Sequence, residues 1–563
     1  MKFKLAFFLI FSAFSAAEAA GQRNNSPESE SVTAALLSAP FSAGVNFSQW
    51  FEVSSAQRIN FKHYTEQDFI DVKSLGADVI RLPVKFHDMT SGTPDYLIDP
   101  LLLRFLDTAV DWAEKHKLYI IIDNHSFHPV IPTPVDIDKI LIPVWSQIAQ
   151  RYRNRSEYVI YEILNEPHGI SDSRWGEIQG MAIDAIRRFD QNRWIIVGGT
   201  DYNSIGKLSA LPLYTDKRLI YTFHFYDPFL FTHQGAGWGE TPLTSLSGVP
   251  FPANPRRMPN VPSSLRGTWV EGGLRNYYNE AAPSRLRATL DRVVAFANQR
   301  NVPVFCGEFG VYIPNSPPQD RVTWYDFVAN ALDNRNISRT SWDYYGGFGI
   351  FNTQGKGDFN SDLNVGVVRA MGFTPPLQIP RKADSITEGF VLFDDYPGRN
   401  VHSGFWGDSD ADFSLYETSA AEGEFAIRWG NAERYNTFWF NFPHSGDFSA
   451  LASGGYFIEF KARTESPVQF DIRFINSEAN SSIPWRMRYV IDEAVLPPDG
   501  RWHTIRIPLD KMTEHGAWIN STQTWLTPRN EFSWKNINRL EFVAEYSDLK
   551  GRRVLFDSIR ITR

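Results

Sequence analysis

Two glutamate residues stand at the ends of strongly apolar stretches and could act as a pair. Glu166 closes YVIYEILNE (residues 158–166), and Glu308 lies in VPVFCGEFG (residues 302–310). Hydrolysis of a glycosidic bond needs two such carboxyls, one to protonate the departing oxygen and one to act as nucleophile or base. A separation of about 5 to 5.5 Å gives retention of configuration, and roughly 6.5 to 9.5 Å gives inversion. The sequence does not determine this distance, but it predicts which two side chains to measure.

Other polar and aromatic residues stand at the ends of similar stretches. Any one of them has an ordinary explanation, such as a helix cap, a solvated surface position or a buried hydrogen-bonding group. Their shared place at one end of different strands has no obvious folding purpose, so we expect them to surround the two glutamates. These residues are Arg81, His125, Asn165, His224, Tyr226 and Trp342.

The elements that must position these residues alternate between two patterns. Segments such as 99–116 and 173–191 repeat apolar residues every three or four positions, which predicts helices. Short apolar stretches between helices predict parallel strands buried on both faces, and eight of them predict a (β/α)8 barrel whose strand ends converge on one rim. The eight stretches are 44–47, 78–84, 118–125, 158–166, 193–199, 219–226, 302–310 and 339–346.

One connection of the predicted barrel is unusually long. Residues 227–282 are rich in Pro and Gly, and a loop of this length is either functional or disordered. Its place on the rim favours a cleft wall, with Trp238 as a candidate for contact with substrate. Trp50, Trp175 and Tyr345 could line the cleft or fill the core.

The pattern changes to a period of two after residue 385. Stretches such as YFIEFKART (456–464) and VQFDIRFIN (468–476), separated by Gly, Asp and Pro, predict an all-β sandwich. Eight of the 17 Trp residues lie in this part. They could bind glycan or fill the core of a structural companion to the barrel.

The N-terminal stretch has the features of a secretory signal. Two Lys residues precede about ten apolar residues, and Ala17-Glu18-Ala19 follows as a cleavage site. The protein is therefore predicted to be secreted, periplasmic or on the cell surface. The predicted organisation is a signal peptide at 1–19, a flexible leader at 20–40, the barrel at 41–372, a linker at 373–385 and the sandwich at 386–563.

Composition narrows the possible partners. The net charge of −8 disfavours nucleic acid and anionic membranes, whereas a neutral polysaccharide is compatible with it. No later stretch of about 18 apolar residues predicts a membrane span. The only cysteine, Cys306, excludes an internal disulfide and is predicted to be a buried strand thiol. We expect a monomer without a metal or organic cofactor.

Six short motifs resemble glycoside hydrolase family 5, the cellulase-like retaining β-glycanases. LNEPHG (164–169) and CGEFG (306–310) are similar to its two signatures, and four more segments match in order: IRLPV (80–84), DNH (123–125), HFY (224–226) and SWDYY (341–345). The stretches FVLFDDYPG (390–398) and RVLFDSIRI (553–561) resemble jelly-roll carbohydrate-binding modules, and this resemblance implies a jelly-roll form for the predicted sandwich.

The resemblance implies a role for each residue. Glu166 corresponds to the acid/base and Glu308 to the nucleophile, which Arg81 would keep ionised. Asn165 would hold the 2-hydroxyl of the sugar. His125 and His224 correspond to two rim histidines, and Tyr226 corresponds to a tyrosine beside the nucleophile. Trp342 corresponds to the platform for the sugar at the cleavage point.

The function predicted from these features is hydrolysis of β-1,4-linked glucan, either cellulose or mixed-linkage β-glucan, by double displacement. β-Mannanase and xyloglucanase activities remain alternatives, because the same catalytic residues would serve all three. A glycan-binding protein without catalysis is a further alternative, which the presence of both glutamates disfavours.

Overall fold

The computed structural model describes residues 37–126, 130–352, 357–380, 386–398, 401–408, 411–476, 483–520 and 522–563. The signal peptide predicted for residues 1–19 lies outside the described residues, and so does the predicted leader apart from residues 37–40. Residues 381–385 of the predicted linker also lie outside them. The domain boundaries therefore stay predictions.

The predicted barrel is confirmed. Its strands are parallel and follow one another in chain order, and pairing of Gly44 with Thr340 closes the circle. Nearly every strand residue is buried, as expected for strands covered on both faces. The strands are β1 (Ala43–Asn46), β2 (Val79–Val84), β3 (Tyr119–Asn124), β4 (Val159–Glu162), β5 (Ile195–Gly198), β6 (Leu219–Phe225), β7 (Val304–Phe309) and β8 (Ser338–Ser341).

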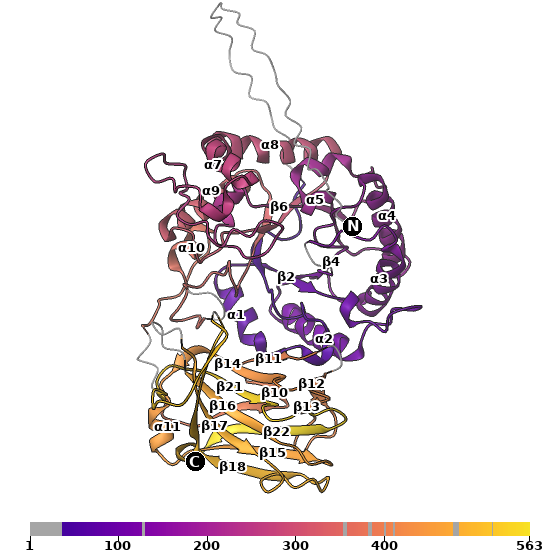
Figure 1. The fold of residues 1–563 in the computed structure, drawn as a ribbon. Helices are drawn as coiled ribbons and strands as arrows, with labels where there is room; N and C mark the ends of the chain where they lie inside the picture. The colour runs from indigo at the N-terminus through magenta and orange to yellow at the C-terminus, as the bar shows by residue number, and fades with distance from the viewer. Residues whose placement is uncertain are drawn as a thin grey trace, which may run out of the picture. The chain divides into compact units, whose positions relative to one another are not determined.

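Helices form the outer layer around these strands, as α2, α3, α4 and α8 show around β2, β4 and β6 in Figure 1. Helix α2 begins where Asp99 accepts a hydrogen bond from the backbone of Leu101, with Pro100 at its first position. The helices are α1 (Glu66–Ser74), α2 (Pro100–Lys115), α3 (Asp138–Tyr152), α4 (Asp172–Arg187), α5 (Thr200–Asn203), α6 (Phe229–Thr232), α7 (Trp269–Glu280), α8 (Pro283–Arg300), α9 (Pro318–Asp333) and α10 (Val365–Ala370). Short 3₁₀ helices are η1 (Ala56–Arg58), η2 (Phe61–His63), η3 (His87–Met89), η4 (Ile205–Ala210) and η5 (Ser263–Leu265).

The barrel interior is divided into an apolar layer and a charged layer. Phe41 packs edge-to-face on Phe305 in an apolar cluster that also contains Val79, Ile121, Ile160, Ile196 and Ile220. Side chains two positions apart along a strand share a face, so the next inward layer toward the carboxyl ends contains Arg81, Asp123 and Glu162. All three are buried. The apolar layer therefore supports a charged layer on the side where the active site is expected.

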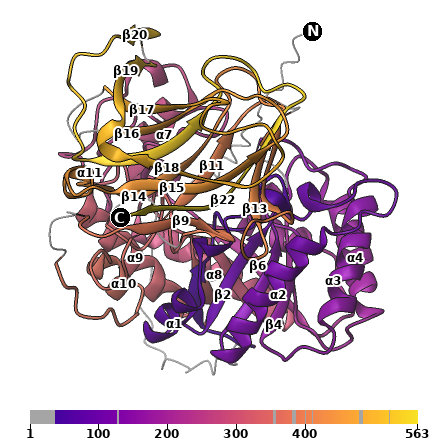
Figure 2. The same ribbon diagram turned by 90° about the horizontal axis from the view of Figure 1, so that it is seen from below.

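The C-terminal part is a sandwich, as predicted, and its described residues form two seven-stranded sheets. The sheets contact each other through aromatic rings, for example Phe438 with Phe556 at 5.3 Å between ring centroids. Their strands are the orange to yellow arrows of Figures 1 and 2. One sheet contains β9 (Phe390–Asp394), β10 (Tyr396–Pro397), β12 (Asp412–Glu417), β13 (Ala426–Gly430), β15 (Phe457–Thr464), β18 (His503–Pro508) and β22 (Arg553–Thr562). The other contains β11 (His402–Trp406), β14 (Thr437–Gly446), β16 (Phe470–Asn476), β17 (Trp485–Ile491), β19 (Thr513–Ile519), β20 (Thr524–Leu526) and β21 (Ile537–Val543). Two short helices, α11 (Ser449–Ser453) and η6 (Leu509–Lys511), connect strands.

Candidate active site

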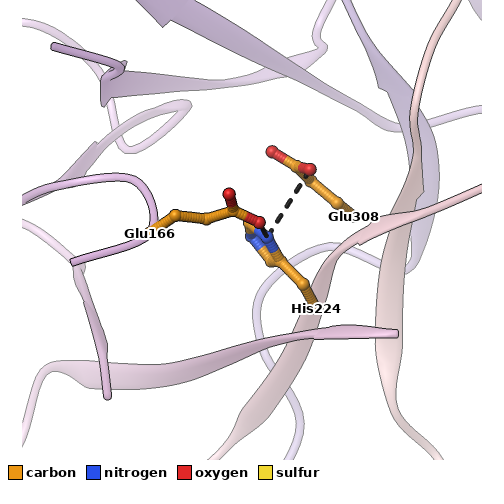
Figure 3. Close-up of side chains that lie close together, drawn as sticks. All are labelled: Glu166, His224 and Glu308. Atoms are coloured by element: carbon orange, nitrogen blue, oxygen red, sulfur yellow. Dashed lines mark hydrogen bonds and ion pairs between the residues drawn. The ribbon is translucent and has the colours of Figure 1, made fainter. Parts of the chain in front are cut away.

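The two glutamates predicted to form a pair point toward each other across the end of the barrel (Figure 3). Glu308 belongs to β7, whereas Glu166 lies on the loop after β4. Oxygen atoms of the two carboxyls and a ring nitrogen of His224 all lie within 4.8 Å of one another. The two carboxyls are therefore close enough for both to reach one bond of a bound sugar chain.

The backbone of Glu166 has an unusual conformation. Its φ of 44° lies in the left-handed region, which residues other than glycine rarely adopt. The loop is held from both sides: the backbone N–H of Asn165 donates to the carbonyl of Asn124 at 2.9 Å, and Nδ1 of His168 lies 3.0 Å from the carbonyl oxygen of Glu166. These contacts fix the direction in which the Glu166 side chain leaves the loop.

Arg81 connects the charged layer of the barrel to Glu308. Its side chain is 0% exposed, and its guanidinium contacts three carboxylates. The distances are 2.9 Å from Nη1 to Oε1 of Glu308, 3.0 Å from Nη2 to Asp123, and 2.7 Å from Nε to Glu162. Although burial opposes its charged form, the three carboxylates raise the pKa of Arg81 well above its ordinary value. A permanent positive charge therefore lies beside Glu308.

Tyr226 completes the contacts of Glu308. Its hydroxyl donates to Oε2 of Glu308 at 2.8 Å, while Oε1 accepts from Arg81. Burial, with the charge of Glu308, raises the pKa of Tyr226 well above its ordinary value, so the phenol stays a donor. Both oxygens of Glu308 are thus held by donors, which fixes the orientation of this carboxylate in the site.

Glu166 has a different environment. Burial raises the pKa of its carboxyl to about 7, against an opposing influence from His125, Arg81 and His168. Burial also lowers the pKa of His224 to about 4, so this imidazole is neutral near pH 7. Two carboxyls in one site, one held as the anion and one with a proton available near neutrality, are the arrangement that acid/base hydrolysis requires.

A bulge between β6 and β7 brings His224 to the pair. The register shifts between Phe223 and His224, so that His224 stands opposite Glu308. Gly307 is the extra residue of the bulge, between the paired residues Cys306 and Glu308. A Cβ atom at Gly307 would lie 3.2 Å from Nε2 of His224 and 2.8 Å from the hydroxyl of Thr222. The glycine of the CGEFG motif therefore has a structural reason: it leaves room for the imidazole.

His125 and Trp342 lie together on another part of the rim. Their rings stack with centroids 5.4 Å apart and an interplanar angle of 13°. Nδ1 of His125 lies 2.8 Å from Oδ2 of Asp123, and Nε2 lies 3.3 Å from Nδ2 of Asn165. Because Oδ1 of Asn165 accepts from Arg81 at 2.8 Å, its NH2 group is the part that faces His125. The chain thus brings together all six rim residues predicted around the glutamates.

The aromatic candidates divide into two groups. Trp50, Trp175 and Tyr345 are almost completely buried and belong to the core. Trp238 is 44% exposed and packs edge-to-face on Tyr312, with ring centroids 4.8 Å apart. It reaches the catalytic region indirectly, since it also contacts Phe348, whose ring lies 6.0 Å from that of Tyr226.

Glu162 is a site residue that the sequence did not predict. It is buried beside Arg81, and both of its oxygens accept from the guanidinium, at 2.7 and 3.0 Å. Burial raises its pKa to about 7. The available signal was a charged residue inside the apolar stretch YVIYEIL, which an ordinary buried strand would not contain.

A barrel that carries a carboxyl pair at the ends of β4 and β7 defines a class of enzymes, the glycoside hydrolases of (β/α)8 fold. The sequence profile of one family, Cellulase (glycosyl hydrolase family 5), matches residues 40–347. The chain belongs to this family, and the predicted resemblance is confirmed.

Known relatives agree with this assignment. Endoglucanase C of Acetivibrio thermocellus is 28% identical over 320 residues, which cover 54% of this chain and 91% of that protein. Endoglucanase 3 of Fibrobacter succinogenes is 28% identical over 354 residues, which cover 58% of this chain and 52% of that protein. Among solved structures, a hyperthermophilic endo-β-1,4-glucanase in complex with substrate is 25% identical, with a TM-score of 0.50 over 59% of this chain and 97% of that one. The protein is thus a glycoside hydrolase.

Proposed function

We propose that this chain hydrolyses β-1,4-linked glucan with retention of configuration, through a covalent glycosyl intermediate on Glu308. The observation that carries the proposal is the separation of the two carboxyls. One oxygen of Glu166 lies within 4.8 Å of one oxygen of Glu308, close to the spacing of about 5 to 5.5 Å that retention needs and below the roughly 6.5 to 9.5 Å that leaves room for water in inversion.

In the first step, Glu308 attacks the anomeric carbon as Glu166 donates its proton to the departing glycosidic oxygen. The C1–O bond breaks, an ester bond forms between C1 and Glu308, and Glu166 is left as the anion. Arg81 and Tyr226 hold Glu308 as a carboxylate before the attack, at 2.9 and 2.8 Å. The raised pKa of Glu166, about 7, keeps its proton available.

In the second step, the anionic Glu166 takes a proton from water, and the hydroxide attacks C1 and displaces Glu308. Glu308 is released as a carboxylate, and Glu166 again carries the proton. His224 supports both stages, because its Nδ1 lies 2.6 Å from Oε1 of Glu166 and 3.5 Å from Oε2 of Glu308. A single neutral donor can therefore stabilise whichever carboxyl is ionised.

The rim residues are proposed to bind the sugar at the cleavage point. The NH2 group of Asn165 can donate to the 2-hydroxyl, because Arg81 occupies the oxygen of the same amide. The Trp342 ring, stacked on His125, offers an aromatic face to the pyranose. Trp238, on the long segment after β6, is the proposed contact at a more distant sugar.

The relatives named endoglucanases support a glucan as substrate, and the similar endo-β-1,4-glucanase structure supports the β-1,4 linkage. The test is cleavage of a panel of β-glucan, carboxymethylcellulose, xyloglucan, glucomannan and xylan, with proton NMR of the first product. The expected result is a product that appears first as the β anomer. The α anomer would contradict retention. Preferential cleavage of glucomannan would indicate a β-mannanase, and preferential cleavage of xyloglucan would indicate a xyloglucanase.

Two variants separate the roles of the glutamates. Glu308→Gln is expected to abolish turnover of every substrate, because no nucleophile remains. Glu166→Gln is expected to lower turnover of glucan by about 10²- to 10⁴-fold, the usual contribution of a general acid. Circular dichroism serves as the control for folding. A variant that keeps both its fold and its full activity would remove that residue from the mechanism.

Secretion and a monomeric state are part of the proposal. The N-terminal stretch supports export, with cleavage near Ala19, which mass spectrometry of the exported protein would test. In the described part of the chain, the helices are all too short or too polar to cross a membrane. We propose no contact with nucleic acid or membrane, because the chain is acidic.

The sandwich is proposed to bind glycan. Its Trp residues divide as they would in a domain with both a core and a ligand surface: Trp429 and Trp485 are buried, whereas Trp406 and Trp525 are 56% and 38% exposed. Exposed rings can stack on sugar faces. Trp406→Ala and Trp525→Ala in the full chain should weaken sedimentation with cellulose; unchanged sedimentation of both variants would favour the structural role.

A further inference from the structure

One sheet of the sandwich has a charged face on the side away from its core. Its strands β14, β21, β16 and β17 are neighbours in this order (Figure 1). Strand pairing aligns two rows of side chains across them, two positions apart on each strand and so on the same face. One row is Trp439, Glu541, Arg473 and Arg488, and the other is Asn441, Arg539, Ile475 and Arg486. The alternate residues, such as Phe440 and Phe542, are buried in the core.

The carboxylates of this face gather around Arg473, whose side chain is 3% exposed. The guanidinium of Arg473 lies 3.2 Å from Asp471 and 3.6 Å from Glu541, and it also pairs with Glu545. Asp471 is shared with Arg488 at 3.3 Å. The negative charges of the face are therefore used at its centre, around one buried arginine.

Arg486 and Arg539 receive much less compensation. They stand on either side of Ile475, on the strands next to it. Arg539 donates to Oδ1 of Asn441 at 2.7 Å but approaches Glu541 only to 4.0 Å. The Nε atom of Arg486 has no hydrogen-bond partner among the described residues. Strands two apart in a sheet are about 10 Å apart, so both guanidinium groups can reach one anion above the isoleucine.

Positive charge is in excess at this place. Burial lowers the pKa of Arg486 below its ordinary value, and Arg473 and Arg539 lower it further against the opposing influence of two glutamates. Burial and three neighbouring arginines also lower the pKa of His515 to about 3. The chain as a whole has a net charge of −8, so this local excess does not follow from its composition.

An indole ring lies beside each of the two arginines. The centres of the Trp439 and Trp525 rings lie 4.8 and 5.6 Å from the nearer guanidinium carbon. Each ring also lies against a glycine of a neighbouring strand: a Cβ atom at Gly404 would be 2.4 Å from Trp439, and one at Gly516 would be 3.0 Å from Trp525. The two rings therefore lie close to the sheet and extend the face on both sides of the arginines.

We propose that Arg486 and Arg539 bind an anionic sugar on this face. The anion is the carboxylate of a uronic acid or a sulfate ester, and it accepts hydrogen bonds from both guanidinium groups above Ile475. The planar donor fork of arginine suits such multi-oxygen anions. Neighbouring sugars of the chain lie along Trp439 and Trp525. This inference rests on the glycan binding proposed for the sandwich, and it names the class of glycan.

The test compares acidic polymers with neutral counterparts of the same backbone. Polygalacturonate carries carboxylates and its methyl ester carries none, and carrageenan carries sulfates that its desulfated form lacks. Electrophoresis of the full chain in native gels that contain each polymer measures the affinity. At least one acidic polymer should retard the protein while its neutral counterpart does not, and the polymer that binds identifies the anion. Retardation by neither acidic polymer, or equal retardation by an acidic polymer and its neutral counterpart, would overturn the proposal.

Variants locate the binding on the face. Arg486→Gln and Arg539→Gln should each weaken the affinity at least about tenfold, because each removes one charged donor from the anion. Arg506→Gln is the matched control: it also removes one positive charge, but from β18 of the other sheet, where the side chain is 47% exposed. Its affinity should be unchanged. An equal loss in all three variants, or no loss in the first two, would overturn the site. Circular dichroism checks folding, and the polymer comparison needs only the unmodified protein.

Sedimentation with cellulose keeps this inference separate from the proposed function. Retardation by an acidic polymer without sedimentation would reject the binding of neutral glucan by the sandwich and support the anionic site. Sedimentation with cellulose without retardation by either acidic polymer would reject the anionic site and leave the proposed function standing.

Discussion

The Nδ1 atom of His224 lies 2.6 Å from the Oε1 atom of Glu166. Burial lowers the pKa of His224 to about 4, and Nδ1 is the ring nitrogen that faces both carboxyls, so the proton of the neutral ring belongs on Nδ1. His224 therefore donates to Oε1 of Glu166. The other oxygen of Glu166 is the one that can carry the proton for the departing sugar.

The pH dependence of activity should follow the pKa of Glu166. Only the protonated form can assist the leaving group, and burial raises this pKa to about 7. We expect kcat/KM for β-glucan to fall by about tenfold per pH unit above this pKa. With 2,4-dinitrophenyl β-cellobioside, whose leaving group needs no proton, this loss should be absent. An identical loss for both substrates would assign it to another group.

Replacement of His224 should shift this alkaline loss. The imidazole donates to Glu166 and so favours its ionised form. In His224→Phe the pKa of Glu166 should rise, and the decline in kcat/KM for β-glucan should begin at a higher pH than in the unmodified protein, although turnover is lower throughout. A shift toward lower pH would contradict this hydrogen-bond assignment.

Removal of Arg81 should destabilise the barrel in a pH-dependent way. Arg81→Met leaves Glu162 and Glu308 buried without the guanidinium that they contact, at a cost of roughly 3 to 5 kcal/mol in the free energy of unfolding at pH 7. Burial already raises the pKa of Glu162 to about 7, and without the guanidinium this pKa rises further, so Glu162 takes up a proton as the pH falls. The cost should therefore be smaller at pH 5.

Unfolding in guanidinium chloride at pH 7 and pH 5 measures this cost. Arg151→Met is the matched control, because Arg151 pairs with Asp107 at a partly exposed position. Its cost should be below about 1 kcal/mol at both pH values. A pH-independent cost for Arg81→Met would show that lost packing, and not uncompensated charge, causes the destabilisation.

The left-handed backbone of Tyr202, in α5, carries strain that substitution can measure. Tyr202→Gly and Tyr202→Ala both remove the ring, but only glycine adopts a φ of 61° without penalty. The glycine variant should be more stable than the alanine variant by about 1 kcal/mol. Gln150 is an exposed position of helix α3, where glycine is unfavourable. There the alanine variant should be more stable than the glycine variant by about 1 kcal/mol. The same order at both positions would argue against strain.

Metal removal should leave hydrolysis intact. Arg81, Tyr226 and His224 supply the charge and the hydrogen bonds that the proposed steps use. Activity should be unchanged after dialysis against EDTA. Added Zn²⁺ should inhibit, because Glu166, His224 and Glu308 present ligand atoms within 4.8 Å of one another. Loss of activity in EDTA that Ca²⁺ or Zn²⁺ restores would contradict a metal-free mechanism.

Much of the architecture could be predicted from local patterns. Strands buried on both faces of a parallel sheet are apolar throughout, and helices on its outside are apolar on one face, so the order of elements is readable along the chain. Glu166 and Glu308 could be singled out because a charged residue at the exit of an apolar strand is conspicuous. The change to alternating residues after position 385 predicted the sandwich in the same way.

Two structural features could not be predicted in this way. Glu162 lies inside an apolar stretch, and only the closed barrel shows that its side chain faces inward, beside Arg81. Tyr202 lies in a short segment without periodicity, and its left-handed backbone and its stacking on His168 depend on contacts with the loop after β4.

The sequence by itself determined the residue types, their order and the strands that carry them. The tertiary structure alone decided the distances on which the chemistry depends. Glu166 and Glu308 come from different strands, and the closure of the barrel, the bulge at His224 and the left-handed backbone of Glu166 together bring their oxygens within 4.8 Å. The pKa of Glu166 has the same origin, because burial is a property of the whole fold and not of the motif that contains the residue.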